Sequence, residues 1–339
     1  MIKRLEIRNF RGVKEGNIEL APLTILLGPN NSGKTTILEA LFLAPNPFRV
    51  VPYGVSKSAV EIVHWMHKTL ESEGYAFLFH NYVEKFAEIK CDDYLLKFYN
   101  EGREILVVSN KETVGGVTSI EGINFYWIGT LSPSTNSFSG PPPPITSVLL
   151  VEDTLLISSN LLKEGMEYLK TNWASIINLG ICKKVAEESS SFVHEKYNDL
   201  TIEPFLDSRL AIYVYLKDGR RIRLGDLGEG IQSYIIMRIL YELRKPKILL
   251  FDVIESHFNP RILNNIAEWL SNLVNNGVQV VLTTHSLEAT RIIASLNEKS
   301  KIYLTSLEEG SLKSKTLSLE EVEEFLNAGI DVRMVESLL

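Results

Sequence analysis

The amino-acid sequence predicts an α/β protein in which a mixed or parallel sheet is flanked by helices, and three observations lead to this prediction. The chain opens with "IKRLEIRNF" and "GNIELA", whose alternation of polar and apolar residues predicts an N-terminal antiparallel β portion. The segment "LTILLG" then runs from a buried strand into a glycine-rich turn that a helix follows. The end of the chain alternates strands and helices, which is typical of parallel sheets with helices on their faces.

Composition and length are those of an ordinary globular protein. The 339 residues are 45% hydrophobic and 23% charged, which suits one large domain or two smaller ones. Apolar runs are interrupted well short of the ~20 residues of a membrane span, and the N-terminus lacks the apolar core of a signal peptide. We therefore expect a cytoplasmic protein without membrane contact. Cys91 and Cys182 have no metal or redox spacing, so we expect buried thiols.

The middle of the chain differs from its two ends. The first helix, "GKTTILEALFLA", is predicted to end at "APNP", because proline removes a backbone donor and restricts its neighbour. After it, "SKSAVEIVHWMHKTLES" is predicted as a helix capped by Ser56 or Ser58, and β-rich pieces follow. "SPSTNSFSGPPPPIT" is predicted as a surface loop before a mostly helical stretch. We predict one unit made of residues 1–45 and 205–339, with residues 46–204 inserted as an α+β region.

The C-terminal part is predicted to contain a hairpin followed by alternating helices and strands. "LAIYVYLKDGRRIRLGDL" is a hairpin with a tight turn at Asp218–Gly219, where both residues are expected to supply positive φ angles. "GIQSYIIMRILYELRKP" is a helix ended by Pro246, and the strand "KILLFD" comes next. "PRILNNIAEWLSNLVNNG" is an amphipathic helix closed by Gly277, followed by the buried strand "VQVVLTTHS" and the helix "LEATRIIASL".

A phosphate-binding loop is the strongest chemical signal in the chain. "GPNNSGKTT" matches the G-x-x-x-x-G-K-S/T pattern with a strand before it and a helix after it. Glycines let backbone N–H groups face phosphates closely, and the helix N-terminus adds its positive dipole end. Lys34 would contact the β and γ phosphates, and the Thr35 hydroxyl would ligate Mg²⁺. The predicted nucleotide-binding residues of the loop are Asn30, Asn31, Ser32, Gly33, Lys34, Thr35 and Thr36.

Two stretches resemble the ABC-type ATPase heads of the SMC, RecF and OLD group. They are "IRNFRG…LTILLGPNNSGKTTILEAL" at the start and "LLFDVIESHFNP…VVLTTHS" near the end. The likeness covers about the first 45 and the last 135 residues, and it is closest to stand-alone ATP-binding proteins of the OLD and RecF-like kind. It implies a P-loop NTPase fold of the ABC-head type, with ATP and Mg²⁺ as cofactors.

The resemblance also implies a role for several residues outside the phosphate loop. Asp252 would hold Mg²⁺ through water, Arg11 would reach toward the nucleotide, and His285 would sense the γ-phosphate. The segment from Ser256 to Pro260 would be the D-loop that meets a partner subunit. The signature motif in "LGEGIQ" would cap the γ-phosphate bound by the other protomer of an ATP-dependent homodimer, through Gly228, Glu229 and Gly230.

Departures from the family pattern leave hydrolysis open. Val253 stands where many relatives carry the acid that orients the attacking water, and valine cannot accept a proton. Glu255 is then the candidate catalytic base, while slow or absent turnover and a base elsewhere in the chain are alternatives. Glutamine does not occur before Gln232, so the usual Q-loop glutamine is missing. His64, His67 and Asn46 are the unranked candidates to replace it.

The favoured function is an ATP-binding and ATP-hydrolysing dimer acting in DNA repair, chromosome maintenance or defence. The alternative is an ATP-binding regulatory or clamp module with little or no hydrolysis, because of Val253. An ABC transporter motor is disfavoured by the degenerate signature and the long insertion. The absence of long heptads excludes SMC-style arms, and the chain ends about 55 residues after His285, too early for a C-terminal nuclease domain. The expected partners are DNA or a separate nuclease or effector protein.

Two further groups of residues leave a choice between binding and structure. A net charge of −7 argues against nucleic-acid binding through the overall field, but it allows a local basic face. A basic group either contacts DNA or forms a solvated edge, and it comprises Arg220, Arg221, Arg223, Arg244, Lys245 and Lys247. An aromatic group is predicted to be core rather than a base-stacking platform, and it comprises Tyr94, Phe98, Tyr99, Phe125, Tyr126 and Trp127.

Overall fold

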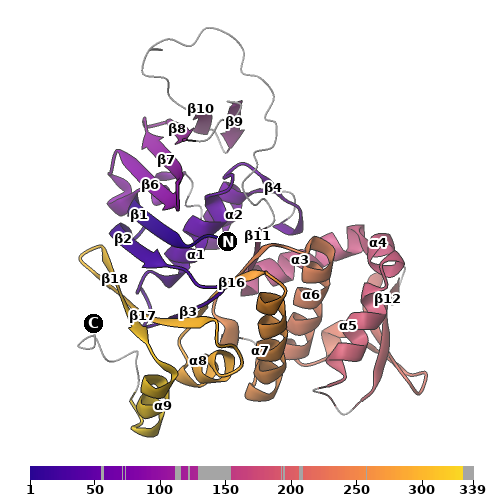
Figure 1. Cartoon of the computed structure of the whole chain (residues 1–339). Helices are drawn as coiled ribbons and strands as arrows, with labels where there is room; N and C mark the ends of the chain where they lie inside the picture. The colour runs from indigo at the N-terminus through magenta and orange to yellow at the C-terminus, as the bar shows by residue number, and fades with distance from the viewer. Residues whose placement is uncertain are drawn as a thin grey trace.

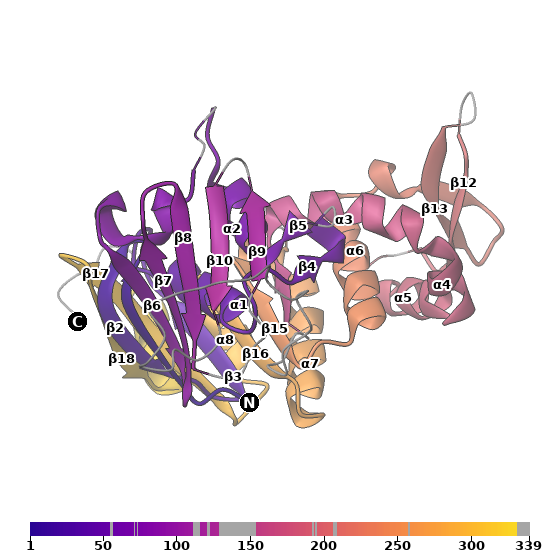
Figure 2. The ribbon, with the colours of Figure 1, turned by 90° about the horizontal axis from the view of Figure 1, so that it is seen from above.

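The computed structural model has a β-rich part at one end and a lobe of helices with a small sheet at the other (Figures 1 and 2). It describes residues 1–54, 57–70, 72, 74–110, 116–120, 123–128, 154–191, 193, 195–205, 209–256 and 258–330. Ser56, His257 and the predicted loop at 132–146 therefore lie outside the described residues. Within the described chain, no helix combines the length and apolar character needed to cross a membrane.

The strands near the N-terminus and the helices are as follows. The strands of the first half are β1 Arg4–Phe10, β2 Val13–Glu19, β3 Leu23–Leu27, β4 Val50–Val51, β5 Lys57–Ser58, β6 Phe86–Cys91, β7 Tyr94–Asn100, β8 Glu104–Ser109, β9 Gly116–Ile120 and β10 Ile123–Ile128. The α-helices are α1 Lys34–Leu43, α2 Ala59–His67, α3 Ser159–Thr171, α4 Trp173–Asn178, α5 Ile181–Ser189, α6 Glu229–Arg244, α7 Pro260–Asn275, α8 Leu287–Ala294 and α9 Leu319–Asn327.

The later strands and the short 3₁₀ turns complete the set. The strands are β11 Thr154–Ile157, β12 Tyr197–Pro204, β13 Leu210–Leu216, β14 Arg221–Arg223, β15 Ile248–Phe251, β16 Gln279–Thr284, β17 Ser300–Glu308 and β18 Ser311–Leu317. The 3₁₀ turns are η1 Pro52–Gly54, η2 Ala76–Leu78, η3 His80–Tyr82, η4 Leu224–Asp226 and η5 Ile254–Ser256.

One mixed sheet organises the described chain. Its 13 strands run in the order β11-β15-β16-β3-β17-β18-β2-β1-β6-β7-β8-β10-β9. The five strands from β11 to β17 are parallel, and every residue of β3, β15 and β16 is buried. Antiparallel pairing of β1 with β2 and of β6 with β7 dominates the other half of the sheet. The predicted α/β fold with a mixed sheet flanked by helices is confirmed.

The middle of the chain adds strands to this same sheet. Strand β6 pairs with β1, so β6 to β10 extend the N-terminal antiparallel part. Strand β11 pairs with β15 at the opposite edge. Residues 46–204, predicted as an insertion, thus contribute to both edges of the sheet. The cap of α2 is Ser58, whose hydroxyl accepts from Glu61 N–H while its own N–H donates to the Glu61 carboxylate.

The predicted hairpin forms between β13 and β14, but its turn differs in one detail. Strands β13 and β14 pair antiparallel, from Tyr213–Arg223 to Tyr215–Arg221. Gly219 has a φ of 88°, whereas Asp218 does not have the positive φ that we predicted. Its carboxylate instead accepts a hydrogen bond from Arg220 N–H at 3.0 Å, which stabilises the turn without a left-handed residue at that position.

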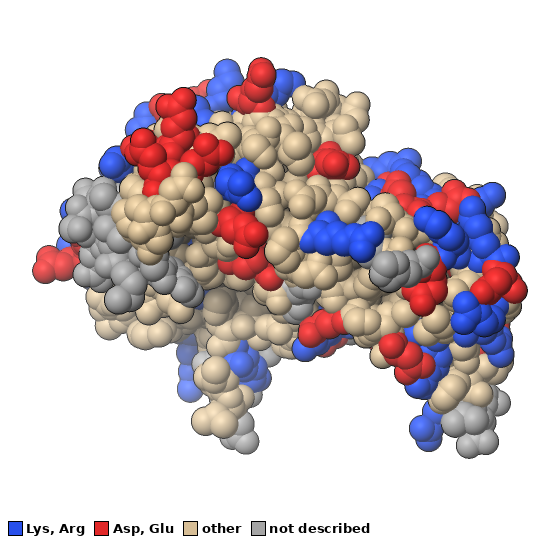
Figure 3. All heavy atoms as spheres, turned by 90° about the horizontal axis from the view of Figure 1, so that it is seen from below, with Lys and Arg blue, Asp and Glu red and all other residues tan. Residues whose placement is uncertain are grey.

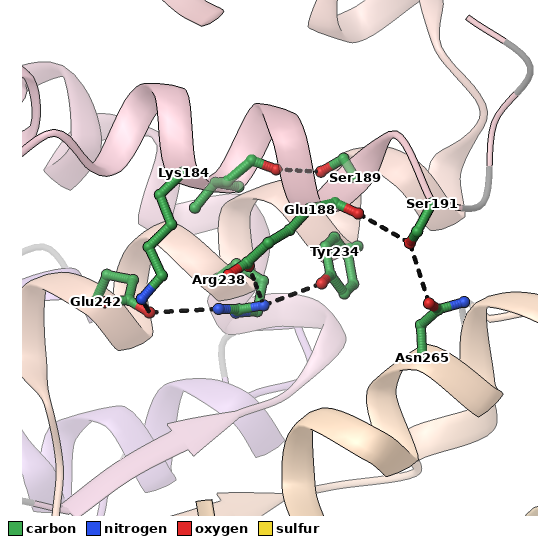
Figure 4. A network of polar contacts seen from close by, with 9 residues as sticks. Lys184, Glu188, Ser189, Ser191, Tyr234, Arg238, Glu242 and Asn265 are labelled. Carbon is green, nitrogen blue, oxygen red and sulfur yellow. Dashed lines mark hydrogen bonds and ion pairs between the residues drawn. The ribbon is translucent and has the colours of Figure 1, made fainter. Parts of the chain in front are cut away.

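A polar network holds together the helices of the lobe (Figure 4). Arg238 on α6 is buried, and its guanidinium donates to Tyr234 at 3.0 Å and to Glu242 at 3.3 Å and forms an ion pair with Glu188 of α5. It also lies over the Trp269 ring of α7, 4.7 Å from the ring centroid. Lys184 donates to Glu242 at 2.7 Å. Helices α5, α6 and α7 are therefore joined by charged as well as apolar contacts.

Candidate functional site

The phosphate loop lies between β3 and α1, as predicted. Gly28 and Gly33 have φ angles of 156° and 83°, and Asn31 has a φ of 61°. A Cβ on Gly28 would lie 2.5 Å from the Thr305 carbonyl, and one on Gly33 would lie 2.9 Å from the Leu312 side chain. Gly28 therefore requires glycine because a neighbouring strand approaches its backbone closely, and Gly33 requires it because of its positive φ.

Neighbouring strands also brace the loop through hydroxyl groups. The Ser32 hydroxyl lies 3.1 Å from the Thr305 hydroxyl, which donates to the Leu27 carbonyl at 3.2 Å. Ser32 and Thr36 are buried, whereas Asn30 and Asn31 are exposed at the tip. The loop shape is thus held by β3 and β17 from below, and its tip faces outward.

Lys34 is a buried cation among neutral oxygens. Its Nζ atom donates to the carbonyls of Gly28 and Pro29 at 2.9 and 2.6 Å and to the Ser32 hydroxyl at 3.0 Å. Burial lowers the pKa of Lys34 to about 8, although the charges of Asp252 and Glu255 act in the opposite direction. The ammonium group is therefore placed where a nearby anion would stabilise its charged form.

Asp252 lies next to Thr35 at the carboxyl ends of the parallel strands. Thr35 Oγ1 is 3.2 Å from Asp252 Oδ1, and the Thr283 hydroxyl donates to the same oxygen at 2.8 Å. The Thr283 hydroxyl in turn accepts from Val253 N–H at 2.8 Å. Thr283, which the sequence reasoning did not single out, therefore orients Asp252 and fixes the backbone after it. The sequence could have indicated Thr283, because it lies two positions before His285 in "TTHS".

Glu255 and His285 meet beside the first glycine of the loop. Glu255 Oε1 accepts from His285 N–H at 2.6 Å, and His285 Nδ1 lies 2.9 Å from the Gly28 carbonyl. Since a carbonyl only accepts, Nδ1 carries the proton, and Nε2 is an acceptor in the neutral ring. The other Glu255 oxygen, Oε2, is buried and has no hydrogen-bond partner among the described residues. This oxygen is therefore still able to accept a hydrogen bond.

Backbone strain accompanies this placement. Val253 has a φ of 50°, which β-branched residues rarely adopt. The η5 turn follows directly and places Glu255 one turn beyond the end of β15. Strain of this kind persists where surrounding contacts fix the backbone, here the bond from Val253 N–H to Thr283. The valine therefore occupies a bend that brings Glu255, three positions after Asp252, back toward the loop.

Arg11 lies in a second cluster, beside α1. It forms an ion pair with the buried Glu39, and its Nη1 atom is 2.8 Å from His67 Nε2. His67 Nε2 is also 2.5 Å from Glu39 Oε1. Burial lowers the pKa of Arg11 to about 10, against the opposing charges of Tyr82 and Asp252. Burial and the charge of Arg11 lower the pKa of His67 to about 4, so its ring is neutral near pH 7.

The three candidates for the missing glutamine have different surroundings. His67 lies in the Arg11 cluster, close enough to Asp252 for that charge to act on its pKa. His64 is buried, with its ring 4.9 Å from that of Tyr75 and 5.5 Å from that of Phe77. Asn46 is buried and accepts from Phe48 N–H at 2.8 Å. Of these, His67 contacts Arg11, the residue predicted to reach toward the nucleotide. Glu39, the carboxylate that contacts His67, was not predicted from the sequence.

The signature segment opens α6. Gly228 is the N-cap, it is exposed, and a Cβ there would meet nothing within 4 Å. Glu229 is exposed and Gly230 is half-buried. Gln232 donates to the Leu227 carbonyl at 2.6 Å, which holds the turn before the helix. Asn259, in the predicted D-loop, is the N-cap of α7. Its side chain accepts a hydrogen bond from Ile262 N–H at 3.0 Å.

Each arginine of the basic hairpin has a carboxylate partner. Arg223 pairs with Asp226, and Arg220 pairs with Asp218, each within 2.7 Å, while Arg221 pairs with Glu203. Lys, Arg, Asp and Glu side chains are mixed over the same end of the molecule (Figure 3). The hairpin therefore presents little uncompensated positive charge, which favours a solvated edge over a phosphate-binding face.

The remaining expectations concern the aromatic residues and the cysteines. Tyr94, Phe98, Phe125 and Trp127 are buried, as predicted for core residues, whereas Tyr99 and Tyr126 are half-buried. Cys91 and Cys182 are buried free thiols, as predicted, and burial raises the pKa of both to about 12.

Magnesium bound with nucleotide phosphates needs few protein ligands. Mg²⁺ is usually held by one or two protein oxygens, several waters and the phosphates rather than by an all-protein cage. In the described chain, no group of three or more His, Cys, Asp or Glu side chains forms such a cage. The adjoining Thr35 hydroxyl and Asp252 carboxylate fit the first arrangement, because both are oxygen donors at the end of the phosphate loop.

Comparisons with known proteins agree with this geometry. A family model described as "AAA ATPase domain" matches residues 1–112, and one described as "AAA domain, putative AbiEii toxin, Type IV TA system" matches residues 180–290. The OLD nuclease of Thermus scotoductus is 51% identical over 43 residues, and the DNA double-strand break repair Rad50 ATPase of Methanopyrus kandleri is 40% identical over 72 residues. These stretches cover 13% and 19% of this chain, and the chain spans 8% of each relative.

A solved structure extends the likeness to nearly the whole chain. The crystal structure of the Smc head bound to the C-winged helix domain of ScpA covers 95% of this chain and 99% of that one, with a TM-score of 0.54 at 15% identity. That likeness concerns the fold. Together with the loop between β3 and α1 and the Thr35–Asp252 pair, it defines a P-loop nucleotide-binding protein. Taken together, these matches support an ABC-type ATPase similar to those of the SMC, RecF and OLD group.

Proposed function

We propose that the protein binds MgATP and hydrolyses it as a nucleotide-gated homodimer that acts in DNA repair, chromosome maintenance or defence. The observation that supports this most is the assembly at the carboxyl ends of β3, β15 and β16. There a buried lysine, a hydroxyl–carboxylate pair and a carboxylate with an unpartnered oxygen adjoin one phosphate loop. These are the parts that phosphoryl transfer needs, because it depends on positioning and charge stabilisation.

Each part has a role in the proposed reaction. The loop backbone and Lys34 hold the phosphates, and Thr35 with Asp252 would hold the magnesium ion. The ion, when bound, neutralises charge that develops on the phosphate oxygens. Glu255 takes the proton of the attacking water on Oε2, because Oε1 is occupied by the hydrogen bond from His285 N–H. The His285 ring can orient the same water through Nε2, which accepts in the neutral tautomer.

The proposed dimer supplies the signature segment of the second copy. Gly228 and Glu229 are exposed at the first turn of α6, where backbone N–H groups face outward and can bind an anion. The relative named for DNA double-strand break repair supports a DNA-linked role for the assembly, and the head bound to ScpA supports a protein partner. The charge-paired hairpin argues for placing any DNA contact outside β13–β14.

Turnover and light scattering test this proposal together. The wild-type chain should release phosphate from MgATP, and its scattering mass should double with MgATP but not without nucleotide. Lys34→Ala should abolish both effects, because the phosphates lose their cation. Arg220→Ala, on the exposed hairpin, is the matched control and should behave like wild type. A monomer under both conditions would contradict the dimer, and absence of phosphate release would contradict the hydrolase.

A further inference from the structure

The carboxyl end of β16 contacts the bend Val253–Glu255 at both of its ends. Where the bend begins, the Thr283 hydroxyl accepts from Val253 N–H at 2.8 Å. Where it ends, Glu255 Oε1 accepts from His285 N–H at 2.6 Å. Thr283 lies in β16, and His285 follows that strand directly. One strand end therefore fixes the position from which the Glu255 side chain projects.

The Thr283 hydroxyl joins this bend to Asp252. It donates its hydrogen to Asp252 Oδ1 at 2.8 Å while its oxygen accepts from Val253 N–H. A hydroxyl has one hydrogen, so donation to Asp252 fixes the direction of the group. Thr283 is fully buried on a strand that lies between β15 and β3, so bulk water does not compete for these two bonds. The two contacts are therefore made by one ordered atom.

Thr283 differs from Thr35, the other threonine that contacts Asp252. Thr35 donates to Asp252 Oδ1 at 3.2 Å, but its hydroxyl is itself a candidate ligand for Mg²⁺, so this bond competes with metal binding. Thr283 is engaged on both sides by protein groups. It can therefore hold Asp252 with and without the ion, and residues that orient a metal ligand in this way affect metal affinity and activity strongly.

We propose that Thr283 is a positioning residue through which the metal carboxylate Asp252 and the proton-accepting carboxylate Glu255 act as one unit. This inference rests on the proposed function, because it assumes that Mg²⁺ with nucleotide binds at Asp252 and that Glu255 accepts the proton. The bond that Thr283 donates holds Asp252 in place. The bond that it accepts holds Val253 at its φ of 50°, which directs Glu255 toward the loop. Loss of the hydroxyl therefore weakens metal binding and displaces the base together.

Thr283→Val in the full chain removes the hydroxyl and keeps the branched shape. The Mg²⁺ concentration for half-maximal ADP binding, measured by calorimetry, should rise about tenfold, and kcat with ATP should fall by about tenfold or more. Thr283→Ala should give the same shifts, and Thr283→Ser should behave like wild type because it keeps the hydroxyl. Thr24→Val is the matched control and should change neither quantity. Thr24 is a buried threonine on β3 whose hydroxyl accepts from Ala21 N–H at 2.9 Å.

Two further measurements separate the two bonds of Thr283. In the Glu255→Gln background, Thr283→Val should cause no additional loss of kcat, because the base is already absent, but it should raise the Mg²⁺ requirement by the same factor. Amide hydrogen exchange in the protein without nucleotide gives a readout that does not depend on turnover. The amide of Val253 should exchange faster in Thr283→Val than in wild type, and at the wild-type rate in Thr24→Val.

The outcomes distinguish this inference from the proposed function. An unchanged Mg²⁺ requirement in folded Thr283→Val would overturn the inference, and so would a further loss of kcat in the double variant, because either result breaks the unit. Equal shifts in Thr24→Val would also overturn it and would point to a loosened sheet. In all three cases the proposed function would stand. Wild-type protein that does not bind ADP with Mg²⁺ would overturn the proposed function and this inference together.

Discussion

Two buried cations in different parts of the molecule have opposite surroundings. Lys34, in the phosphate loop, donates to three neutral oxygens, and burial lowers its pKa to about 8. Arg238, between α5, α6 and α7, is likewise buried, but its charge and hydrogen-bond interactions with Tyr234 and Glu188 together outweigh burial and raise its pKa. A buried cation whose direct hydrogen-bond partners are all neutral is prepared for an anion from outside the fold, whereas a cation in direct contact with carboxylates holds the fold together.

Two glutamates of the same regions, Glu242 and Glu255, differ in the same way in their partners. Glu242 accepts from both Lys184 and Arg238 through Oε1. Glu255 accepts only from His285 N–H through Oε1, and its buried Oε2 lacks a partner among the described residues. We therefore expect substitutions at the loop to change chemistry while folding is preserved, and substitutions in the helix network to change stability while the chemistry of the folded fraction is preserved.

The largest expected effect is on hydrolysis at Glu255. Glu255→Gln should lower kcat by roughly 10²–10⁴-fold, because the amide cannot take a proton, and should leave the affinity for MgATP nearly unchanged. Single-turnover phosphate release and calorimetric binding measure the two quantities. Glu268→Gln, an exposed glutamate on α7, is the control and should have wild-type kcat.

A second substitution shows whether an acid at position 253 can replace Glu255. Val253→Glu in the Glu255→Gln background should recover part of the lost turnover, because it restores an acid next to Asp252. Equal turnover of Glu255→Gln and wild type would place the base elsewhere and remove the contrast between the two carboxylates.

The difference between the two regions also explains what could be predicted from sequence. The phosphate loop, Asp252 and His285 each follow a buried strand directly, so a strand pattern and a few consecutive letters locate them at one sheet edge. The Arg11–Glu39–His67 cluster joins segments far apart in the chain, and only the tertiary fold brings them together. The pairing of β11 with the parallel strands could not be predicted for the same reason, since its partner β15 follows it by about 90 residues.

The next largest effect concerns stability at Arg238. Arg238→Met should lower the free energy of unfolding by about 3 kcal/mol, because it leaves Glu188 without its buried partner. Urea unfolding monitored by circular dichroism measures this loss. Arg220→Met on the exposed hairpin is the matched control and should leave the unfolding midpoint unchanged. Full stability of Arg238→Met, or a loss of kcat at a temperature where it is fully folded, would contradict a purely structural role.

The smallest effect is the pH dependence of nucleotide affinity that Lys34 produces. Below pH 8 the ammonium is already protonated in the free protein, so binding requires no proton. Above pH 8 the free protein loses this proton, and the phosphate charge favours its return, so affinity should fall by up to about tenfold per pH unit. Calorimetry with MgADP from about pH 7.5 to about pH 9.5 measures the slope.

The pH dependence of folding stability gives an independent check. The pKa of Lys34 is lower in the folded than in the unfolded chain, so between about pH 8 and pH 10.5 the unfolded chain binds more protons. The cost of burying the charge is fully present below pH 8 and disappears as the pH rises through this window. Lys34→Met lacks that cost, so its stability advantage over wild type should shrink across the same window. A constant difference, together with a flat affinity profile, would show that Lys34 is matched by charge as Arg238 is, and the contrast between the two cations would be lost.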